Sequence, residues 1–122
     1  GAGVLVVLTN NGWFGTGGAA EQHAAHSVLR AVETRRPVLR CGNAGWSGWI
    51  DDFGVVRSVL SDPERGISFR GSRSIDLTRD ARWIDRTSFY VEHGNWFVAL
   101  AAFLALAGWW LIRSGSPERG PK

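Results

Sequence analysis

The order of apolar and polar positions divides the chain into several short apolar runs and one long apolar segment near its end. The first run, residues 4–8, consists only of valine and leucine and stops at Thr9, Asn10, Asn11 and Gly12. A short continuous run that ends in turn residues predicts a strand buried on both of its faces. Such a strand needs neighbouring strands and cover on each face. Little sequence precedes it, so we expect part of that cover to come from chain outside this sequence.

Residues 21–34 have the period of an amphipathic helix. The apolar side chains at positions i, i+3, i+4 and i+7 predict its buried face, and they are Ala25, Val28, Leu29 and Val32. Pro37 ends the helix, and Arg35 and Arg36 suit its C-terminus. Glu33 lies roughly a quarter of a turn from the centre of the apolar face. We therefore expect its carboxylate to be half-buried and to have a partner.

Short strands are predicted in the segment that follows. Residues 37–41 read as one strand, which is broken by a run of small residues around Asn43. The acidic turn Asp51–Gly54 is typical of a hairpin, and the two strands that it joins are residues 46–50 and 55–60. Residues 66–77 are expected to hold one or two further short strands.

The long apolar segment, residues 96–112, contains no charged side chain. At about 1.5 Å per residue, a helix of this length is at the short end of what crosses a bilayer. Trp96 stands at one end and Trp109 and Trp110 at the other, where membrane surfaces favour tryptophan. A core helix of a water-soluble domain does not explain a segment that is apolar on all sides and bracketed by tryptophan. The segment is therefore predicted to span a membrane.

The charges on each side of this segment predict its orientation. Arg113, Arg119 and Lys122 follow it, whereas Arg82 and Arg86 precede it alongside acidic residues. Under the positive-inside rule, the tail is then cytoplasmic and the domain before the span lies on the opposite side.

Composition narrows the classes of function. The chain has 122 residues and a formal net charge of +3, carried mainly by scattered arginines, so nucleic-acid binding is not expected. A single cysteine, Cys41, excludes an internal disulfide and a multi-cysteine metal site. Seven tryptophans favour surfaces at which apolar and aqueous surroundings meet.

The residues most often used in catalysis do not form a recognisable site. His23 and His26 are three positions apart on the predicted helix, but His93 lies beside the apolar segment and no third ligand has suitable spacing, so no metal is expected. No G-x-S-x-G nucleophile motif is present. Cys41 falls inside a predicted strand, with Arg40 on the opposite face, so we expect a buried and unreactive thiol.

The ends of the first two predicted strands carry the remaining candidate site. Asn10, Asn11 and Trp13 follow the first strand, and Gly42 and Asn43 follow the second. In α/β sheets, ligands bind beyond the C-terminal ends of the strands, so these residues are candidates for a pocket wall. Asparagine and glycine are also ordinary turn residues, and the sequence leaves both interpretations open.

Three stretches and the terminal apolar segment resemble a known family. They are "GVLVVLTNNGWFG" at 3–15, "EQHAAHSVLRAVETRRPVLRCGNAGWSGWIDDFG" at 21–54 and "SFYVEHGNWF" at 88–97. Together they resemble the C-terminal quarter of the bacterial apolipoprotein N-acyltransferases. The first two stretches also resemble, more loosely, the nitrilase (carbon–nitrogen hydrolase) superfamily, and the terminal span singles out the acyltransferase branch.

The resemblance implies an α/β fold: the C-terminal part of a nitrilase-like αββα sandwich followed by one transmembrane helix. Residues 1–80 are then a partial nitrilase-like domain, 81–95 a membrane-proximal connector, 96–112 the transmembrane helix and 113–122 a polar tail. The expected location is the bacterial inner membrane, with the nitrilase-like part in the periplasm and the tail in the cytoplasm.

The family's reaction transfers an acyl chain from a phospholipid donor to the N-terminal cysteine of a diacylated prolipoprotein. It proceeds through a thioester on a cysteine, with a glutamate as general base and a lysine at the oxyanion. The resemblance places all three of these residues upstream, so no catalytic residue is expected in this chain, and neither a cofactor nor a metal is implied.

The same resemblance assigns supporting roles to a few residues of this chain. Asn10 and Trp13 match an N-D-x-W-F-G loop at the mouth of the active site, where Trp13 and Phe14 would meet acyl chains. Asn11 departs from the aspartate of that loop. Glu33 matches the glutamate of an R-A-x-E-x-x-R-P helix end near the catalytic centre. Asn43 is the remaining candidate for the pocket wall.

Two alternatives remain at this stage. The chain could belong to a membrane-tethered nitrilase-type amidase that acts on small amides, or it could be a non-catalytic membrane-anchored domain. The acyltransferase and the amidase both require a cysteine nucleophile upstream of this chain. They differ in whether several membrane helices precede the domain. The non-catalytic domain requires no such cysteine.

Overall fold

The computed structural model describes residues 1–15 and 17–114. The described elements follow one another in the order β1 (Leu5–Asn10), η1 (Gly12–Phe14), α1 (Ala19–Thr34), β2 (Val38–Asn43), β3 (Gly48–Ile50), β4 (Val56–Val59), η2 (Ala81–Trp83), α2 (Phe89–His93) and α3 (Trp96–Ser114). They form two compact units, one from Gly1 to Glu92 and a second that begins at His93. The mixed α/β class expected from the sequence is confirmed.

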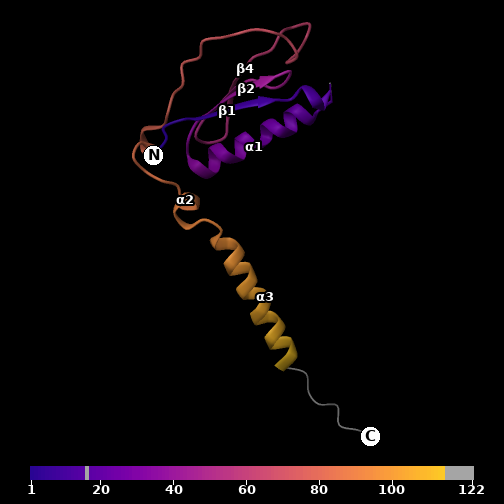
Figure 1. The fold of residues 1–122 in the computed structure, drawn as a ribbon. Coiled ribbons are helices and arrows are strands. Elements are labelled where there is room, and N and C mark those ends of the chain that lie inside the picture. The colour runs from indigo at the N-terminus through magenta and orange to yellow at the C-terminus, as the bar shows by residue number, and fades with distance from the viewer. Residues whose placement is uncertain (16, 115–122) are drawn as a thin grey trace. The chain divides into compact units, whose positions relative to one another are not determined.

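One four-stranded sheet, in the order β1-β2-β3-β4, organises the first unit. β1 and β2 are parallel and are joined through α1, whereas β3 and β4 add antiparallel strands (Figure 1). The register pairs Leu5 with Val38 at one end and Asn10 with Asn43 at the other. The β1–α1–β2 connection therefore brings the C-terminal ends of both parallel strands to the same edge of the sheet.

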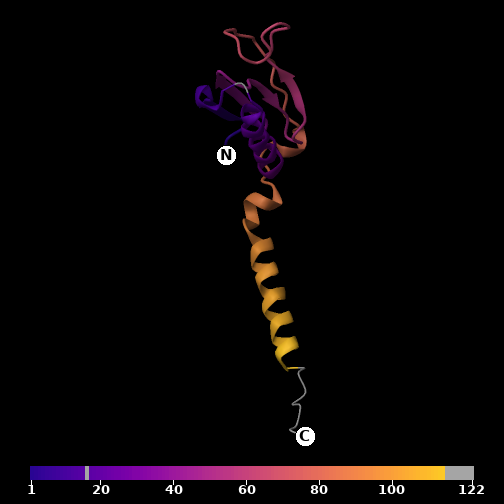
Figure 2. The ribbon, with the colours of Figure 1, turned by 90° about the vertical axis from the view of Figure 1, so that its right-hand side faces the viewer.

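The core lies between α1 and one face of this sheet (Figure 2). Its buried cluster consists of Ala24, Ala31, Val38, Trp46 and Ile50, and Leu5 and Val7 of β1 pack against it. Because side chains alternate along a strand, the residues between them, Val6 and Leu8, point to the opposite face. These two side chains are 61% and 77% exposed. The expectation that β1 is buried on both faces is therefore wrong for this chain: α1 covers one face only.

Helix α1 begins at Ala19, two positions before the predicted start, and ends at Thr34 as predicted. Its buried stripe is made of small side chains, namely Ala20, Ala24, Ser27 and Ala31. Of the face predicted from the sequence, Val28 is partly buried and packs against the core, whereas Ala25 is exposed, Leu29 is 56% exposed and Val32 is 38% exposed. The predicted face is therefore correct only at Val28, because the helix packs against the sheet through its smallest residues, which leaves the larger ones at the rim.

The hairpin predicted around the acidic turn is confirmed as β3 and β4. Asp51 closes the turn: its Oδ1 accepts hydrogen bonds from the backbone N–H groups of Phe53 and Val55, both at 2.9 Å. Gly54 has a φ of +83°, and a Cβ there would lie 2.6 Å from Cγ2 of Val32. Glycine is thus required both by the turn and by the approach of α1.

Residues 66–77 do not form the strands that the sequence predicted. The nearest β interaction is an isolated bridge between Asp62 and Gly66. Ile67 packs against the core, and Phe69 and Ile75 line a cavity over β2 and β3. The apolar side chains of this segment cover part of one face of the sheet. Its backbone does not pair with an edge strand of that sheet.

The segment after the sheet is fastened to the C-terminal end of α1. The guanidinium of Arg36 donates to the backbone carbonyls of Ala2, Trp83 and Arg86 at 2.8, 3.1 and 2.8 Å. The hydroxyl of Ser88 donates to the backbone carbonyl at the end of the helix, that of Glu33. Two side chains, Arg36 and Ser88, therefore tie this segment to the C-terminal end of α1.

In the second unit, α3 is long and apolar enough to cross a membrane, and it is the one such helix in the described part of the chain. Its 19 residues carry no charge before Arg113, and none of its side chains is buried. The helix predicted at residues 96–112 is confirmed and continues to Ser114. Of the predicted polar tail, residues 115–122 lie outside the part that the structure describes.

Candidate functional site

The two strand ends identified in the sequence meet in the structure. Asn10 and Asn43 are register partners at the last paired positions of β1 and β2. The Nδ2 group of Asn43 donates to Oδ1 of Asn10 at 3.1 Å, and the same oxygen accepts from the backbone N–H of Gly12 at 3.2 Å. One asparagine side chain thus links the end of the neighbouring strand to the turn that follows its own strand.

That turn, residues Gly12–Phe14 of η1, is called the aromatic turn below. The indole Nε1–H of Trp13 donates to the backbone carbonyl of Asn10 at 2.9 Å, and the N–H of Phe14 donates to the carbonyl of Asn11 at 3.0 Å. Trp13 is nevertheless 80% exposed and Phe14 is 42% exposed. Gly15 then takes a φ of +65°, which glycine adopts without strain. The turn fixes the edge of a large aromatic ring and leaves its faces open.

Asn11 is the buried centre of this arrangement, with only 1% of its surface exposed. Its backbone N–H donates to the carbonyl of Asn43 at 2.9 Å, and its Oδ1 accepts from Oγ1 of Thr9 at 3.2 Å. The same Oδ1 lies 3.0 Å from Nδ1 of His23 on α1. A Cβ at Gly45, in the β2–β3 connection, would lie 2.3 Å from Nδ2 of Asn11. Strand, helix and connection therefore converge on one amide.

His23 was considered from the sequence only as a possible metal ligand. In the structure its ring contacts the ring of Phe14 edge to face, with centroids 5.8 Å apart and planes at 87°. His26, one turn further along the helix, is exposed. Within the described residues, no three His, Cys, Asp or Glu side chains gather as a metal site. Sequence reasoning missed these contacts of His23, because no local pattern shows that the first turns of α1 pack back over the strand end.

Glu33 lies far along α1 from His23. It is next to the last residue of the helix, whereas His23 is in its N-terminal half. Its side chain is 25% exposed, and Oε2 lies 2.6 Å from Nη2 of Arg30. The expected half-buried carboxylate with a partner is therefore found. The structure does not bring Glu33 together with Asn10, Trp13 or the other candidates.

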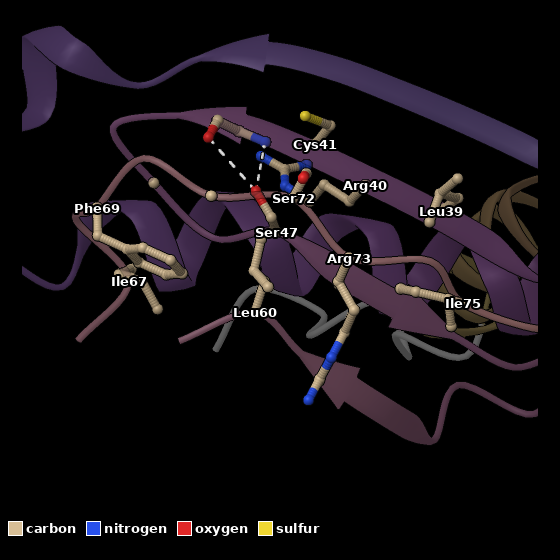
Figure 3. A pocket seen from close by; sticks show the side chains of 14 residues that line it. Leu39, Arg40, Cys41, Ser47, Leu60, Ile67, Phe69, Ser72, Arg73 and Ile75 are labelled. Atoms are coloured by element: carbon tan, nitrogen blue, oxygen red, sulfur yellow. Dashed lines mark hydrogen bonds between the residues drawn. The ribbon is translucent and has the colours of Figure 1, made fainter. Parts of the chain in front are cut away.

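A cavity of about 300 Å³ lies over β2 and β3 and beneath the segment that contains Phe69 and Ile75 (Figure 3). The hydroxyl of Ser47 on its wall accepts from the backbone N–H of Gly42 at 2.9 Å. Cys41 also borders this cavity, and its thiol is exposed. The expectation of a buried thiol is therefore wrong, because Cys41 points to the face of β2 that α1 leaves uncovered.

Arg40 points the other way, as the strand alternation predicted. It is 2% exposed, and its Nη1 donates to Oγ of Ser27 on α1 at 3.0 Å. Burial away from water disfavours the charged form and lowers the pKa of the Arg40 guanidinium. The pair Arg40 and Ser27 forms a polar contact inside the helix–sheet interface.

Comparison with known proteins places these features in a family. No family model matches the sequence. The chain is 34% identical over 113 residues to an apolipoprotein N-acyltransferase of Thermotoga maritima, a match that covers 93% of this chain and 21% of the relative. It is 35% identical over 120 residues to that of Gloeobacter violaceus, covering 98% and 21%, and 37% identical over 115 residues to that of Verminephrobacter eiseniae, covering 92% and 17%.

The chain thus spans about a fifth of the length of the curated relatives that it matches. The alignment with each of the first two relatives extends over more than nine-tenths of this chain. These matches confirm the family inferred from the sequence motifs, and the chain belongs by sequence to the apolipoprotein N-acyltransferases.

Proposed function

We propose that this chain is the C-terminal portion of a membrane-bound apolipoprotein N-acyltransferase, which moves an acyl chain from a phospholipid to the N-terminal diacylglyceryl-cysteine of a lipoprotein. The relatives named for this activity and the apolar helix α3 support the proposal. The catalytic cysteine, glutamate and lysine are supplied by parts of the parent protein outside this sequence. No cofactor takes part.

In the proposed reaction, the glutamate takes the proton of the cysteine thiol, and the thiolate attacks the ester carbonyl of the phospholipid. The C–O bond breaks, and the lysophospholipid leaves as an alcohol after it takes that proton from the glutamate. The α-amino group of the acceptor then attacks the thioester, an amide forms, and the C–S bond breaks. The amine gives up a proton to the glutamate, which returns it to the cysteine sulfur, and the lysine stabilises the oxyanion in both steps.

The proposed contribution of this chain is an aromatic contact at the lipid entrance. The observation that carries it is that Trp13 is held by a 2.9 Å hydrogen bond from its indole N–H while 80% of its surface stays exposed. A fixed indole exposes apolar surface at little cost in conformational freedom, and tryptophan is favoured where acyl chains meet water. Phe14 widens the same surface. Asn10 and Asn43 hold the turn that presents both rings.

The remaining assignments follow the family. Residues 1–80 are proposed to be part of a periplasmic nitrilase-like αββα sandwich, with 81–95 as connector, 96–112 as the transmembrane helix and 113–122 as a cytoplasmic tail. The exposed β1 face that carries Val6 and Leu8 suits a second sheet as cover. Glu33 keeps its proposed role as a support for the catalytic centre.

The test uses the full-length parent protein in detergent, a phospholipid donor and a synthetic diacylated lipopeptide, with amide formation followed by mass spectrometry. Trp13→Ala is expected to lower kcat/KM about tenfold, equal to about 1.4 kcal/mol of transition-state stabilisation, while Trp13→Phe, which keeps an aromatic face but loses the hydrogen bond to Asn10, gives an intermediate value. The matched control is Phe53→Ala, since Phe53 is an aromatic that is 41% exposed on the β3–β4 turn. Equal rates for Trp13→Ala and wild type would remove the proposed lipid contact.

The same preparation distinguishes the enzyme classes. Ammonia released from small amides, without lipopeptide acylation, would identify a nitrilase-type amidase. If the folded full-length protein forms neither the acylated lipopeptide nor ammonia, the non-catalytic membrane-anchored domain is the remaining interpretation.

A further inference from the structure

His23 joins α1 to the residue before the aromatic turn and to the last residue of the turn. Its Nδ1 lies 3.0 Å from Oδ1 of Asn11, the residue before the turn, and its ring meets the edge of Phe14, the last residue of the turn. Trp13 lies between these two contacts. His23 itself is partly buried on the helix and belongs to no group of metal-ligating residues within the described part of the chain.

The contact with Asn11 fixes the tautomer of His23. The carbonyl oxygen of an asparagine side chain can only accept hydrogen bonds, so Nδ1 of His23 must carry the hydrogen. Oδ1 of Asn11 already accepts from Oγ1 of Thr9, which sets the orientation of the amide. The opposite side of that amide, Nδ2, is buried against Gly45 and has no hydrogen-bond partner among the described residues. The hydrogen bonds from Thr9 and His23 are therefore the directional contacts that hold the Asn11 side chain.

The backbone of Asn11 passes this constraint to the turn. Its N–H is bonded to the carbonyl of Asn43, and its carbonyl accepts from the N–H of Phe14 at 3.0 Å. The side-chain contacts of Asn11 therefore restrain the same residue whose backbone bonds to the neighbouring strand end and makes the first hydrogen bond of the turn. The edge-to-face contact between His23 and Phe14 restrains the turn a second time from its other end.

We propose that His23 is a positioning residue that sets the orientation of the aromatic turn, and with it the indole of Trp13, through its hydrogen bond to Asn11 and its contact with Phe14. His23 touches neither substrate nor reacting atoms in this proposal. The structural part of the inference stands on this chain alone, and its consequence for lipid transfer rests on the proposed function.

The first experiment measures the turn directly. The full-length protein is labelled with 5-fluorotryptophan, and its Trp13 signal is assigned as the ¹⁹F resonance that disappears in Trp13→Phe. His23→Phe keeps an aromatic ring against Phe14 but removes the hydrogen-bond donor. His23→Asn keeps a donor near the Nδ1 position but removes the ring. His26→Phe is the matched control on an exposed position of the same helix.

We expect His23→Phe to shift or broaden the Trp13 resonance, His23→Asn to leave it closer to the wild-type position, and His26→Phe to leave it unchanged. An unchanged Trp13 resonance in a His23→Phe protein with a wild-type thermal midpoint would overturn the inference. If His23→Phe does not fold, His23→Asn is compared with His23→Ala, which has neither the ring nor the donor. A Trp13 resonance displaced equally far in both variants would show that the hydrogen-bond donor has no positioning role.

Acyl transfer by the same proteins separates this inference from the proposed function. If both hold, His23→Phe lowers kcat/KM about as much as Trp13→Ala, and the double variant loses little more, since both changes act on one contact. A displaced Trp13 signal with wild-type kinetics would keep the positioning role and remove the role of Trp13 in lipid transfer. Lower kcat/KM without any displacement would overturn the positioning role.

Discussion

Two neighbouring residues of β2 show how strand geometry decides the environment of a side chain. Arg40 is buried beneath α1, whereas Cys41 opens to the other face of the sheet. The exposed thiol removes burial as a reason to exclude Cys41 as the nucleophile. A stronger reason replaces it: a nucleophilic cysteine needs a neighbouring base, and among the described residues no histidine or carboxylate lines the cavity of about 300 Å³ that Cys41 borders.

Cys41→Ala in the full-length parent should therefore keep most of its acyl-transfer activity. Because the side chain is exposed, the change in the free energy of unfolding should stay within about 0.5 kcal/mol. Rates of lipopeptide acylation and a thermal midpoint measure both effects. An acyl group found on Cys41 by mass spectrometry, or a folded but inactive variant, would contradict the prediction.

Asp51 predicts a pH dependence of stability at the residue scale. Burial alone would raise the pKa of its carboxyl. Hydrogen bonds from the N–H of Val55, from the side chain of Arg57 at 2.7 Å and from the N–H of Phe53 outweigh burial and hold the pKa below its ordinary value. The carboxylate therefore stabilises the fold above the pKa of an unfolded aspartate, about 3.9, and this stabilisation is lost as the pH falls through the lower folded value.

Asp51→Asn should accordingly lower the free energy of unfolding at pH 7 and flatten its decline between about pH 5 and pH 2. Urea unfolding of the full-length protein in detergent, followed by tryptophan fluorescence across that range, tests the slope. Asp62→Asn is a suitable control, since Asp62 also caps a turn, through hydrogen bonds from the N–H groups of Glu64 and Arg65, both at 2.9 Å. Identical slopes for wild type and Asp51→Asn would refute the assignment.

The residue scale also shows what the sequence could and could not predict of the site. Asn10, Trp13 and Asn43 were found because apolar runs that end in asparagine and glycine mark strand ends, and parallel strands bring those ends together. The link between His23 and Asn11 could not be found in this way. It depends on how the first turns of α1 pack back over the strand end, which no local pattern specifies.

At the scale of elements, α1 illustrates the limit of periodicity. The helical period was correct, but the face was predicted from the larger apolar side chains. The structure instead buries alanine and serine, with Ala31 completely inaccessible, since a close helix–sheet approach admits only small residues. Turn chemistry predicted the β3–β4 hairpin well, because Asp51 and Gly54 satisfy local requirements. Residues 66–77 were misassigned because their apolar positions serve packing onto a face.

This packing predicts that Ala31→Leu destabilises the protein by about 1–3 kcal/mol through overpacking. Leu29→Ala, at a position 56% exposed, should change the free energy of unfolding by no more than about 0.5 kcal/mol. Thermal or urea unfolding of the two variants gives the comparison. The reverse order of effects would restore the face that the sequence predicted.

At the scale of the whole molecule, the sheet unit and the apolar helix differ in how they bury their apolar side chains. The sheet unit has a core on one face of β1–β4 and leaves apolar side chains such as Val6 and Leu8 on the other. Helix α3 has no buried side chain at all, although it is apolar from Trp96 to Ile112. The sequence predicted α3 from the length of its apolar run and its lack of charge, whereas an apolar run alone did not show that α1 would cover only one face of β1.

The orientation of α3 in the membrane rests on a small charge difference. Arg113, Arg119 and Lys122 follow the apolar segment, and Arg82 and Arg86 precede it. Because lysine and arginine are retained on the cytoplasmic side, the C-terminal end should be cytoplasmic and the sheet unit periplasmic. If this prediction holds, the aromatic turn lies on the side of the membrane where we propose that lipoprotein substrates are acylated.

A reporter enzyme that is active only in the periplasm, fused after Lys122 of the full-length protein, should consequently give no signal, and a reporter active only in the cytoplasm should give a strong one. Replacing Arg119 and Lys122 with glutamine leaves one basic residue after the span against two before it, so the orientation signal of this segment is reversed in sign. These two substitutions are made in a reporter fusion that carries residues 81–122 alone, which isolates the local signal. The expected result is a detectable periplasmic signal from that variant and none from the same fusion without the substitutions. A strong periplasmic signal from the wild-type fusion would reverse the topology and remove the sheet unit from the periplasm.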